Sequence, residues 1–269
     1  MTFPAASDLK QVFTLKYGDQ DSLSWGPRLR HQAGYFTPDD IYEATVIGLV
    51  DEGTHWLDVG GGRDVFPSNS KAAWLLSKRC RLLVGIDPSD NIHSNEFVHQ
   101  RFQTTIEDYK TDLRFDVATL RMVAEHITSP QQAVKGLANL VRPGGRVIVY
   151  TVHRWSPISL VSSLIPFALH NHVKQIFWRT QDRDTFPVAY LMNTRSALEQ
   201  VFSSTGFQML HFTHLDDCRT FARWRVLTKL ELMAWKLLKK GRLHYPETCI
   251  LGIFERLPER DQTSLEDHP

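Results

Sequence analysis

The stretch WLDVGGGRD, residues 56–64, joins a short apolar run to three consecutive glycines. Trp56 to Val59 has the length and composition of a buried strand, and the glycines begin where that strand would end. Glycine adopts backbone conformations that other residues avoid, and its missing side chain lets a ligand approach the main chain. The segment therefore predicts a buried strand that ends in a ligand-binding turn.

A second strand supplies an acidic partner for this turn. Residues 82–86 form another apolar run, which ends at Asp87 and Pro88. In a βαβ unit the carboxyl ends of both strands lie at one edge of the sheet, where a carboxylate can accept hydrogen bonds from ribose hydroxyls. A tight structural turn would explain the glycines alone, and Asp87 before Pro88 is also typical of turns. The two features together favour a nucleoside-binding site.

Short apolar strands continue to alternate with helices on both sides of this unit. Strands are predicted at residues 56–59, 82–86, 102–106, 115–120, 146–151, 207–212 and 249–254. Helices are predicted at residues 41–50, 71–76, 131–140, 196–203 and 221–240. Such alternation indicates an α/β fold, because each crossover helix covers one face of a parallel sheet. We expect a Rossmann-like sheet of seven mostly parallel strands, with helices on both faces and an antiparallel last strand.

The same pattern divides the chain into five parts. Residues 1–54 are predicted to form a helical N-terminal cap, and residues 55–152 the cofactor-binding core. Residues 153–206 are predicted to be an inserted segment that contacts the substrate or forms a lid. Residues 207–257 complete the sheet around a helical insertion. Residues 258–269 are charged and almost free of large apolar side chains, which predicts a disordered tail.

The composition argues against several classes of function. A chain of 269 residues with a formal net charge of +1 can bury an α/β core, but it lacks the positive charge typical of nucleic-acid binding. Cys80, Cys218 and Cys249 are widely spaced and form no CxxC pair, so neither a disulfide scaffold nor a metal site is expected. No secretory signal or bilayer-spanning apolar run is visible, which predicts a cytoplasmic protein without a transmembrane segment.

One predicted helical segment, residues 221–240, mixes basic and apolar side chains. This pattern is typical of a solvated helix face that packs on one side only. Peripheral contact with a membrane surface, or with an acidic acceptor, is the alternative interpretation.

The residues after the glycines distinguish between two nucleotide cofactors. A dinucleotide site needs a further glycine, so that pyrophosphate can sit on the following helix N-terminus. Here Asp64 stands two residues after Gly62, and Pro67 follows. An acidic side chain suits a diphosphate poorly but is compatible with a cofactor that carries an amino group. A sulfonium cofactor is therefore favoured, and an NAD-type oxidoreductase is the alternative among enzymes.

Five blocks between Trp56 and Val152 resemble, in the same order, the motifs of class I methyltransferases. They read WLDVGGGRD, LLVGIDPS, TTIEDY, FDVATLRMVAEHI and LVRPGGRVIVYTV. In its overall sequence pattern the chain most resembles the type 11 small-molecule methyltransferases, which include enzymes of quinone biosynthesis. The resemblance implies S-adenosylmethionine as cofactor and a small organic acceptor, with O-methylation favoured over C- or N-methylation. A catalytically silent cofactor-binding partner subunit is the alternative outside enzymes.

The resemblance also implies which residues bind the cofactor. They are Asp58, Gly60, Gly61, Gly62, Asp87, Pro88, Ile106, Glu107, Leu120 and Arg121. Asp58 would lie near the methionine amino group, Asp87 would hold the ribose, and Arg121 would line the methionine side. The sequence departs from the family pattern at Thr105, where an acid often reads the adenine, and at Asp64, where the last glycine is usual.

Methyl transfer needs alignment of two groups and the removal of at most one proton, so no catalytic triad is expected. Three residues are candidates for that proton transfer. His126 follows the fourth strand, and a structural role is the alternative for it. His153 follows the fifth strand at the mouth of the expected cleft, and Tyr190 belongs to the inserted segment.

Overall fold

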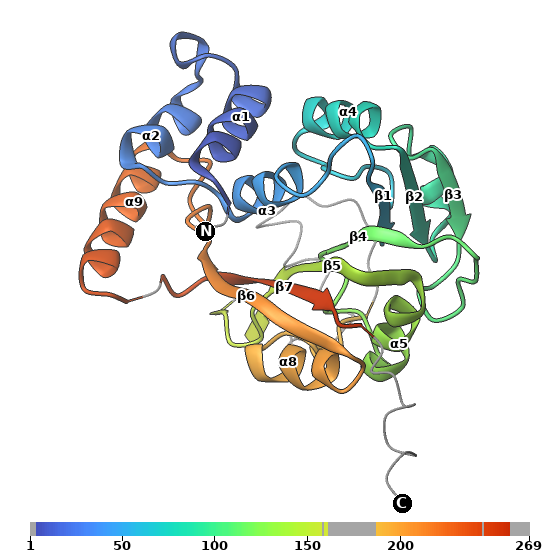
Figure 1. Ribbon diagram of the computed structural model, residues 1–269. Helices are drawn as coiled ribbons and strands as arrows, with labels where there is room; N and C mark the ends of the chain where they lie inside the picture. The colour runs from blue at the N-terminus through green and yellow to red at the C-terminus, as the bar shows by residue number, and fades with distance from the viewer. Residues whose placement is uncertain (1–3, 158, 161–186, 244, 259–269) are drawn as a thin grey trace, which may run out of the picture.

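The computed structural model describes residues 4–157, 159–160, 187–243 and 245–258 (Figure 1). Seven strands form one sheet in the order β3-β2-β1-β4-β5-β7-β6. Their bounds are β1 His55–Val59, β2 Leu82–Asp87, β3 Gln100–Gln103, β4 Phe115–Arg121, β5 Val141–Val152, β6 Phe207–Asp216 and β7 Thr248–Arg256. Only β7 runs antiparallel to its neighbours, β5 and β6. The predicted Rossmann-like fold class is therefore confirmed.

Side chains alternate along each central strand between two hydrophobic clusters, one on each face of the sheet. Leu57 and Val59 of β1 belong to the cluster that packs under α5 (Pro130–Leu140) and α8 (Arg195–Ser203). Trp56 belongs to the cluster that packs against α3 (Pro38–Ile47) and α4 (Ser70–Arg79). This period of two is what a sheet buried on both faces requires, and it accounts for the nearly continuous apolar strands.

Local capping explains where several helices begin. Thr37 accepts a hydrogen bond from the backbone N–H of Asp40, and the Asp40 carboxylate accepts one from the backbone of Thr37, which forms a complete capping box for α3. Asn69 and Thr194 each accept a bond from the third residue of α4 and α8. These side chains satisfy backbone N–H groups that the helix itself leaves unpaired.

The third strand lies at Gln100–Gln103, two residues before the predicted 102–106. Its partner β2 ends at Asp87, which pairs with Gln103, and Thr104 then donates to the carbonyl oxygen of Asp87 at 3.0 Å. No further residue of β2 is available to extend the ladder. The predicted bounds were wrong because they followed the apolar residues from Phe102 to Ile106. The observed bounds are set instead by pairing with β2, which ends at Asp87.

The N-terminal part contains α1 (Ala6–Tyr17), α2 (Trp25–Ala33) and α3. Helix α9 (Arg225–Lys240), which is inserted between the last two strands, packs on α2 beyond the end of β6 (Figure 1). Tyr35 and Trp235 form the centre of that contact, with ring centroids 5.0 Å apart. Helix α9 begins at Arg225, four residues after the predicted start, because residues 221–224 form a turn. Two distant segments therefore share one small core.

Two predictions fall partly or wholly outside the described residues. About half of the inserted segment, residues 161–186, and nearly all of the tail, residues 259–269, are not described. In the part of the chain that is described, no helix combines the length and apolarity that a membrane span requires.

Candidate cofactor and acceptor site

The carboxyl ends of β1, β2 and β4 meet at one edge of the sheet, because these strands are parallel neighbours. This edge carries Asp58 near the end of β1, Asp87 at the end of β2 and Arg121 at the end of β4. Ligands of open α/β sheets bind in the crevice at this edge. The topology therefore brings together the acidic and glycine residues that the sequence singled out.

The glycine turn has a conformation that only glycine accommodates. Gly60 and Gly62 have φ angles of 72° and 41°, in the left-handed region. A Cβ atom on Gly60 would collide with the Val123 side chain, and one on Gly61 would lie 3.0 Å from Asp58 Oδ2. The turn is thus tightly packed on its protein side, which explains three successive glycines.

The N–H groups of the turn point into the protein. Gly60 and Gly61 both donate to the carbonyl oxygen of Ile86, at 2.8 and 3.2 Å. The Asn95 side chain, which is fully buried, donates to the carbonyl oxygen of Gly61 at 2.9 Å. These bonds hold the turn in place, so contact with a cofactor would involve its bare Cα surface and its remaining carbonyl groups. Sequence reasoning missed Asn95, because it lies beyond β2 in no recognisable motif.

Asp87 is oriented by two backbone donors. Its Oδ2 accepts a hydrogen bond from Gly62 N at 3.0 Å, and its Oδ1 accepts one from Ser89 N at 2.8 Å. Only 7% of the residue is exposed. Each carboxylate oxygen can accept more than one hydrogen bond, so this arrangement fixes the group for hydroxyl donors of a ribose. The geometry fits the proposed nucleoside.

Asp58 is buried beneath the turn and differs electrostatically from Asp87. Its Oδ1 accepts a hydrogen bond from Thr119 Oγ1 at 2.7 Å, and Thr119 in turn accepts one from Trp56 Nε1 at 2.8 Å. Burial raises the pKa of Asp58 to about 7, although the Thr119 bond and Arg121 oppose the shift. A cationic ligand beside this carboxyl would favour its ionised form. The amino and sulfonium groups of S-adenosylmethionine fit that requirement.

The residues expected to contact the adenine and the methionine part of the cofactor differ in burial. Ile106 and Leu120 belong to the hydrophobic core, with 3% and 0% exposure. Pro88 is exposed and Glu107 is half-buried. Arg63, which sequence reasoning did not consider, reaches from the turn to Asn91 Oδ1 at 2.8 Å.

Arg121 takes part in an ion-pair cluster that joins the cap to the sheet. Its guanidinium donates to Asp39 Oδ1 at 2.7 Å, and Arg219 pairs with the other oxygen of Asp39. Arg219 also donates to both oxygens of Asp217, at 2.6 Å. Burial opposes ionisation of Asp39, but Arg219 and Arg121 outweigh it and hold its pKa well below the usual range. In the sequence, the helix-capping motif TPDD at residues 37–40 is the feature that could have drawn attention to Asp39.

His126 and Tyr190 are brought together by Glu125, the residue before His126. The carbonyl oxygen of Glu125 accepts from Ala189 N at 2.7 Å and from Tyr190 N at 3.2 Å. His126 Nδ1 lies 3.0 Å from the carbonyl oxygen of Pro187. The segment that carries Tyr190 is therefore attached beside the end of β4, and Tyr190 itself has a left-handed φ of 52°.

The carboxylate of Glu125 continues this polar network toward β5. It accepts from Thr151 Oγ1 at 2.6 Å, and Asn193 Nδ2 donates to the same hydroxyl at 2.8 Å. Burial raises the pKa of Glu125, although the bond from Thr151 opposes the shift. Neither Thr151 nor Asn193 was predicted, because their partners lie in distant segments.

His153 lies just beyond β5 and faces the last two strands. Its Nδ1 is 3.3 Å from Thr248 Oγ1, and its ring contacts the His214 ring edge-on at 5.0 Å. Asn193 bonds to the carbonyl oxygen of the preceding Val152 at 2.9 Å, which connects His153 to the segment of Tyr190. The three predicted catalytic candidates therefore belong to one region next to the cofactor edge.

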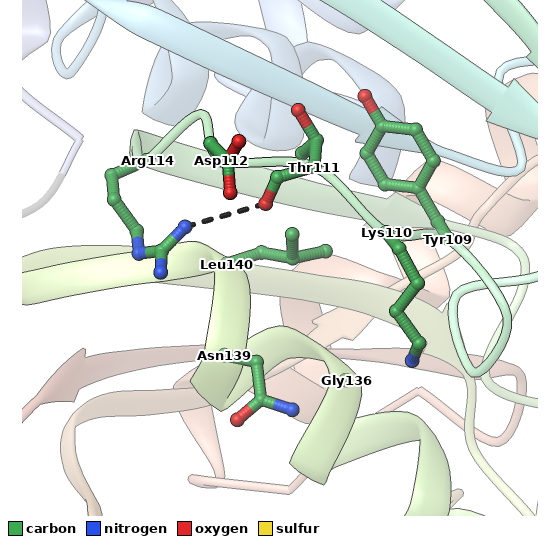
Figure 2. A pocket seen from close by; sticks show the side chains of 8 residues that line it. All are labelled: Tyr109, Lys110, Thr111, Asp112, Arg114, Gly136, Asn139 and Leu140. Carbon is green, nitrogen blue, oxygen red and sulfur yellow. Dashed lines mark hydrogen bonds between the residues drawn. The ribbon is translucent and has the colours of Figure 1, made fainter.

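A hollow of about 390 Å³ lies elsewhere, between the loop Tyr109–Arg114 and the second half of α5 (Figure 2). In it Arg114 donates to the carbonyl oxygen of Thr111. This loop precedes β4, so the hollow lies at the amino end of that strand. The cofactor residues lie at the carboxyl ends, and the hollow is separate from them.

A family model described as a methyltransferase domain matches residues 29–212, which is more than half of the chain. The chain belongs to this methyltransferase family. Its fold is that of class I S-adenosylmethionine-dependent methyltransferases, and S-adenosylmethionine is the cofactor. The recognition and the cofactor predicted from the sequence are thus confirmed.

Curated relatives of this chain include two named ubiquinone biosynthesis O-methyltransferase. The protein from Coxiella burnetii strain Dugway is 26% identical over 165 residues, which is 56% of this chain and 66% of the relative. The protein from Alkalilimnicola ehrlichii is 33% identical over 124 residues, 42% of this chain and 47% of the relative. The chain therefore spans less than two thirds of the length of these relatives.

Two solved structures show the same fold at low identity. A chain from a complex of the Trm112 methyltransferase activator and a methyltransferase of Haloferax volcanii has a TM-score of 0.54 and 12% identity, covering 92% of this chain and 100% of its own. The [4+2]-cyclase SpnF has a TM-score of 0.50 and 12% identity, covering 81% of each chain. Because a cyclase shares the fold, the fold alone does not define the reaction.

Proposed function

We propose that this methyltransferase transfers the methyl group of S-adenosylmethionine to an oxygen atom of a small organic acceptor. The observation that carries the proposal is the similarity to relatives named ubiquinone biosynthesis O-methyltransferase across the cofactor-binding core. Those names favour a hydroxyl group as the acceptor, and a ring hydroxyl of a quinone precursor as the first chemical class to test. The net charge of +1 gives no reason to prefer a nucleic acid.

In this proposal the protein mainly binds and orients. S-adenosylmethionine supplies the activated methyl group on a positively charged sulfur when it is bound. Asp87, which two backbone N–H groups hold in place, accepts hydrogen bonds from the ribose. Asp58 lies beneath the glycine turn and balances positive charge of the bound cofactor. The Cα atoms of the turn provide a close, side-chain-free contact.

The acceptor would lie on the β4–β5 side of the same edge. His153 accepts the hydroxyl proton in this proposal, because an imidazole titrates near neutral pH and its Nδ1 is already oriented by Thr248. His126 and Tyr190 contribute to the wall of the acceptor site, since both are attached to Glu125 through the segment around Pro187. Arg121 lines the boundary between cofactor and acceptor.

The test is transfer of an isotope-labelled methyl group into fractionated cell extract and into simple phenols and catechols, with mass identification of the product. An O-methyl product is expected. A product methylated only on carbon or nitrogen would contradict the proposal. Binding of S-adenosylhomocysteine without transfer to any fraction would instead favour the catalytically silent subunit.

The role of His153 is tested by the His153→Asn variant. Loss of a general base should lower kcat by about 10²- to 10⁴-fold and remove the rise of rate with pH that a general base produces. The matched control is His211→Asn, because His211 lies midway along the edge strand β6. If His153→Asn retains the wild-type rate and pH profile, His153 is not the base.

A further inference from the structure

Helix α9 has one face that is firmly held by the rest of the protein. Its buried residues are Thr228, Glu231, Leu232 and Trp235. Trp235 Nε1 donates to Asp216 Oδ2 at 2.9 Å, and Tyr245 Oη donates to Glu231 Oε1 at 2.9 Å. The orientation of α9 about its axis is therefore fixed, and the same outer face is always presented.

That outer face is a continuous apolar stripe. Val226, Leu230, Met233 and Leu237 follow one another at helical spacings of four, three and four residues, so they lie in one row. Val226 and Leu237 are each 71% exposed, and the other two are more than half exposed. Trp224, just before the helix, is also exposed, as is Leu243 just after it. A row of this length is too regular to be scattered surface hydrophobicity.

Basic side chains run beside the stripe. Arg225, Lys229, Lys236 and Lys240 recur at spacings of four, seven and four residues along one flank of the helix, and all are exposed. Between residues 221 and 243 the only acidic residue is Glu231, which is buried. Arg223, Lys239 and Arg242 add further positive charge. The whole chain has a net charge of only +1, so this concentration is local.

We propose that the outer face of α9 binds the surface of an anionic lipid membrane. An apolar row flanked by lysine and arginine on a helix that lies flat fits the boundary between lipid headgroups and acyl chains. Trp224 suits that boundary, since its ring is apolar and its N–H is polar. Helix α9 and its partner α2 lie at one side of the molecule, away from the sheet (Figure 1).

Charge and shape argue for this occupant over a second copy of the chain. Two copies of α9 meeting through this face would bring like charges together, which destabilises such an association. The helix is convex and offers a ridge, so it lacks the groove that binds an extended or helical peptide. This inference does not depend on the identity of the methyl acceptor, because it concerns a surface outside the candidate site.

The test measures co-sedimentation of the full chain with vesicles of phosphatidylcholine alone and of phosphatidylcholine mixed with phosphatidylglycerol. We expect binding to the anionic vesicles that weakens with added salt, and little binding to the neutral ones. Lys229→Gln with Lys236→Gln should weaken anionic-vesicle binding ~30-fold, at about fivefold for each lysine near the surface. Leu230→Ser with Leu237→Ser should weaken it ~100-fold, because two leucine side chains no longer enter the lipid.

The matched control is Lys78→Gln with Leu210→Ser, a pair of exposed side chains on α4 and β6 that should bind like the wild type. Far-UV circular dichroism and melting curves should match for all variants, because none of the changed residues is buried. Equal vesicle binding by wild type and both α9 variants would overturn the proposal, as would absence of binding to anionic vesicles at low salt. If the wild type dimerises without lipid and the leucine variant does not, the outer face of α9 binds a second copy of the chain instead.

Discussion

The glycine turn and the ion-pair cluster around Asp39 lie at the same edge of the sheet but are assembled over very different sequence distances. Gly62 and Asp87, which bond in the turn, are 25 residues apart and lie within one βαβ unit. Asp39 pairs with Arg121 across 82 residues and with Arg219 across 180 residues. The turn is a local structure formed by elements that follow one another in the chain. The cluster forms only when the N-terminal helices, the core and the C-terminal part have all folded. The turn is accordingly expected to control binding, and the cluster to control stability.

The cluster should show the largest loss of stability. Asp39→Ala removes the carboxylate that pairs with both Arg121 and Arg219 at a partly buried site. The loss of this partner should lower the free energy of unfolding by about 3–5 kcal/mol. The lower end is expected, because the Arg219 side chain is 34% exposed. Urea unfolding measures this loss, with the exposed Asp112→Ala as control. A change below about 1 kcal/mol would mean that the cap and the core are held together by apolar contacts alone.

The buried acid of the turn predicts a dependence of stability on pH. The folded pKa of Asp58, about 7, lies above its ordinary value of 3.8. Its contribution to stability is therefore complete at low pH and is lost as pH rises from about 4 to about 7, by as much as roughly 4 kcal/mol at 1.36 kcal/mol per unit. Asp58→Asn removes this titration and can still accept the Thr119 bond. The variant should match the wild type at pH 4 and be more stable at pH 8, as followed by urea unfolding.

If the difference between the Asp58→Asn variant and the wild type does not change with pH, the pKa of Asp58 is the same in the folded and the unfolded protein, and burial does not raise it. S-adenosylhomocysteine binding provides the complementary measurement. The variant should bind this ligand more weakly than the wild type at pH 8, because the carboxylate no longer balances its amino group.

Asp87→Ala should affect binding more than stability. Loss of hydrogen bonds between a charged carboxylate and the ribose should weaken S-adenosylhomocysteine binding by about 1.5–3 kcal/mol, or ~10- to 150-fold. Calorimetric titration measures this change, and Asp90→Ala, an exposed neighbour in the following 3₁₀ turn, is the control. Unchanged affinity would show that the cofactor does not bind at the end of β2.

The order of strands and the cofactor edge could be predicted because they depend on short-range patterns. Apolar runs such as Leu82–Ile86 indicate buried strands, and three glycines beside an acid indicate a close approach of backbone and ligand. The register of β3 could not be predicted, because it depends on where its neighbour β2 ends. The start of α9 was also misjudged, since Phe221 to Trp224 fit a helical pattern but form a turn.

The polar network around Glu125 shows a second limit. His126, His153 and Tyr190 were singled out one by one, on residue type and position after a strand. Their common neighbourhood depends on a hydrogen bond between Thr151 and Asn193, which lie 42 residues apart, and Asn193 belongs to no motif. Residue type indicates what a side chain can do, but it does not indicate which other side chain it will meet.

The amino-acid sequence by itself determined the α/β class, the glycine turn, the acid at the end of β2 and the choice of S-adenosylmethionine over a dinucleotide. These features depend on hydrophobic periodicity and backbone freedom, which act between residues close in the chain. The tertiary structure alone decided that Asp39 joins Arg121 to Arg219, that Asp58 is buried with a raised pKa, and that α9 turns its apolar row outward. Each of these depends on which surfaces are removed from water when distant segments pack, and burial is a property of the folded chain.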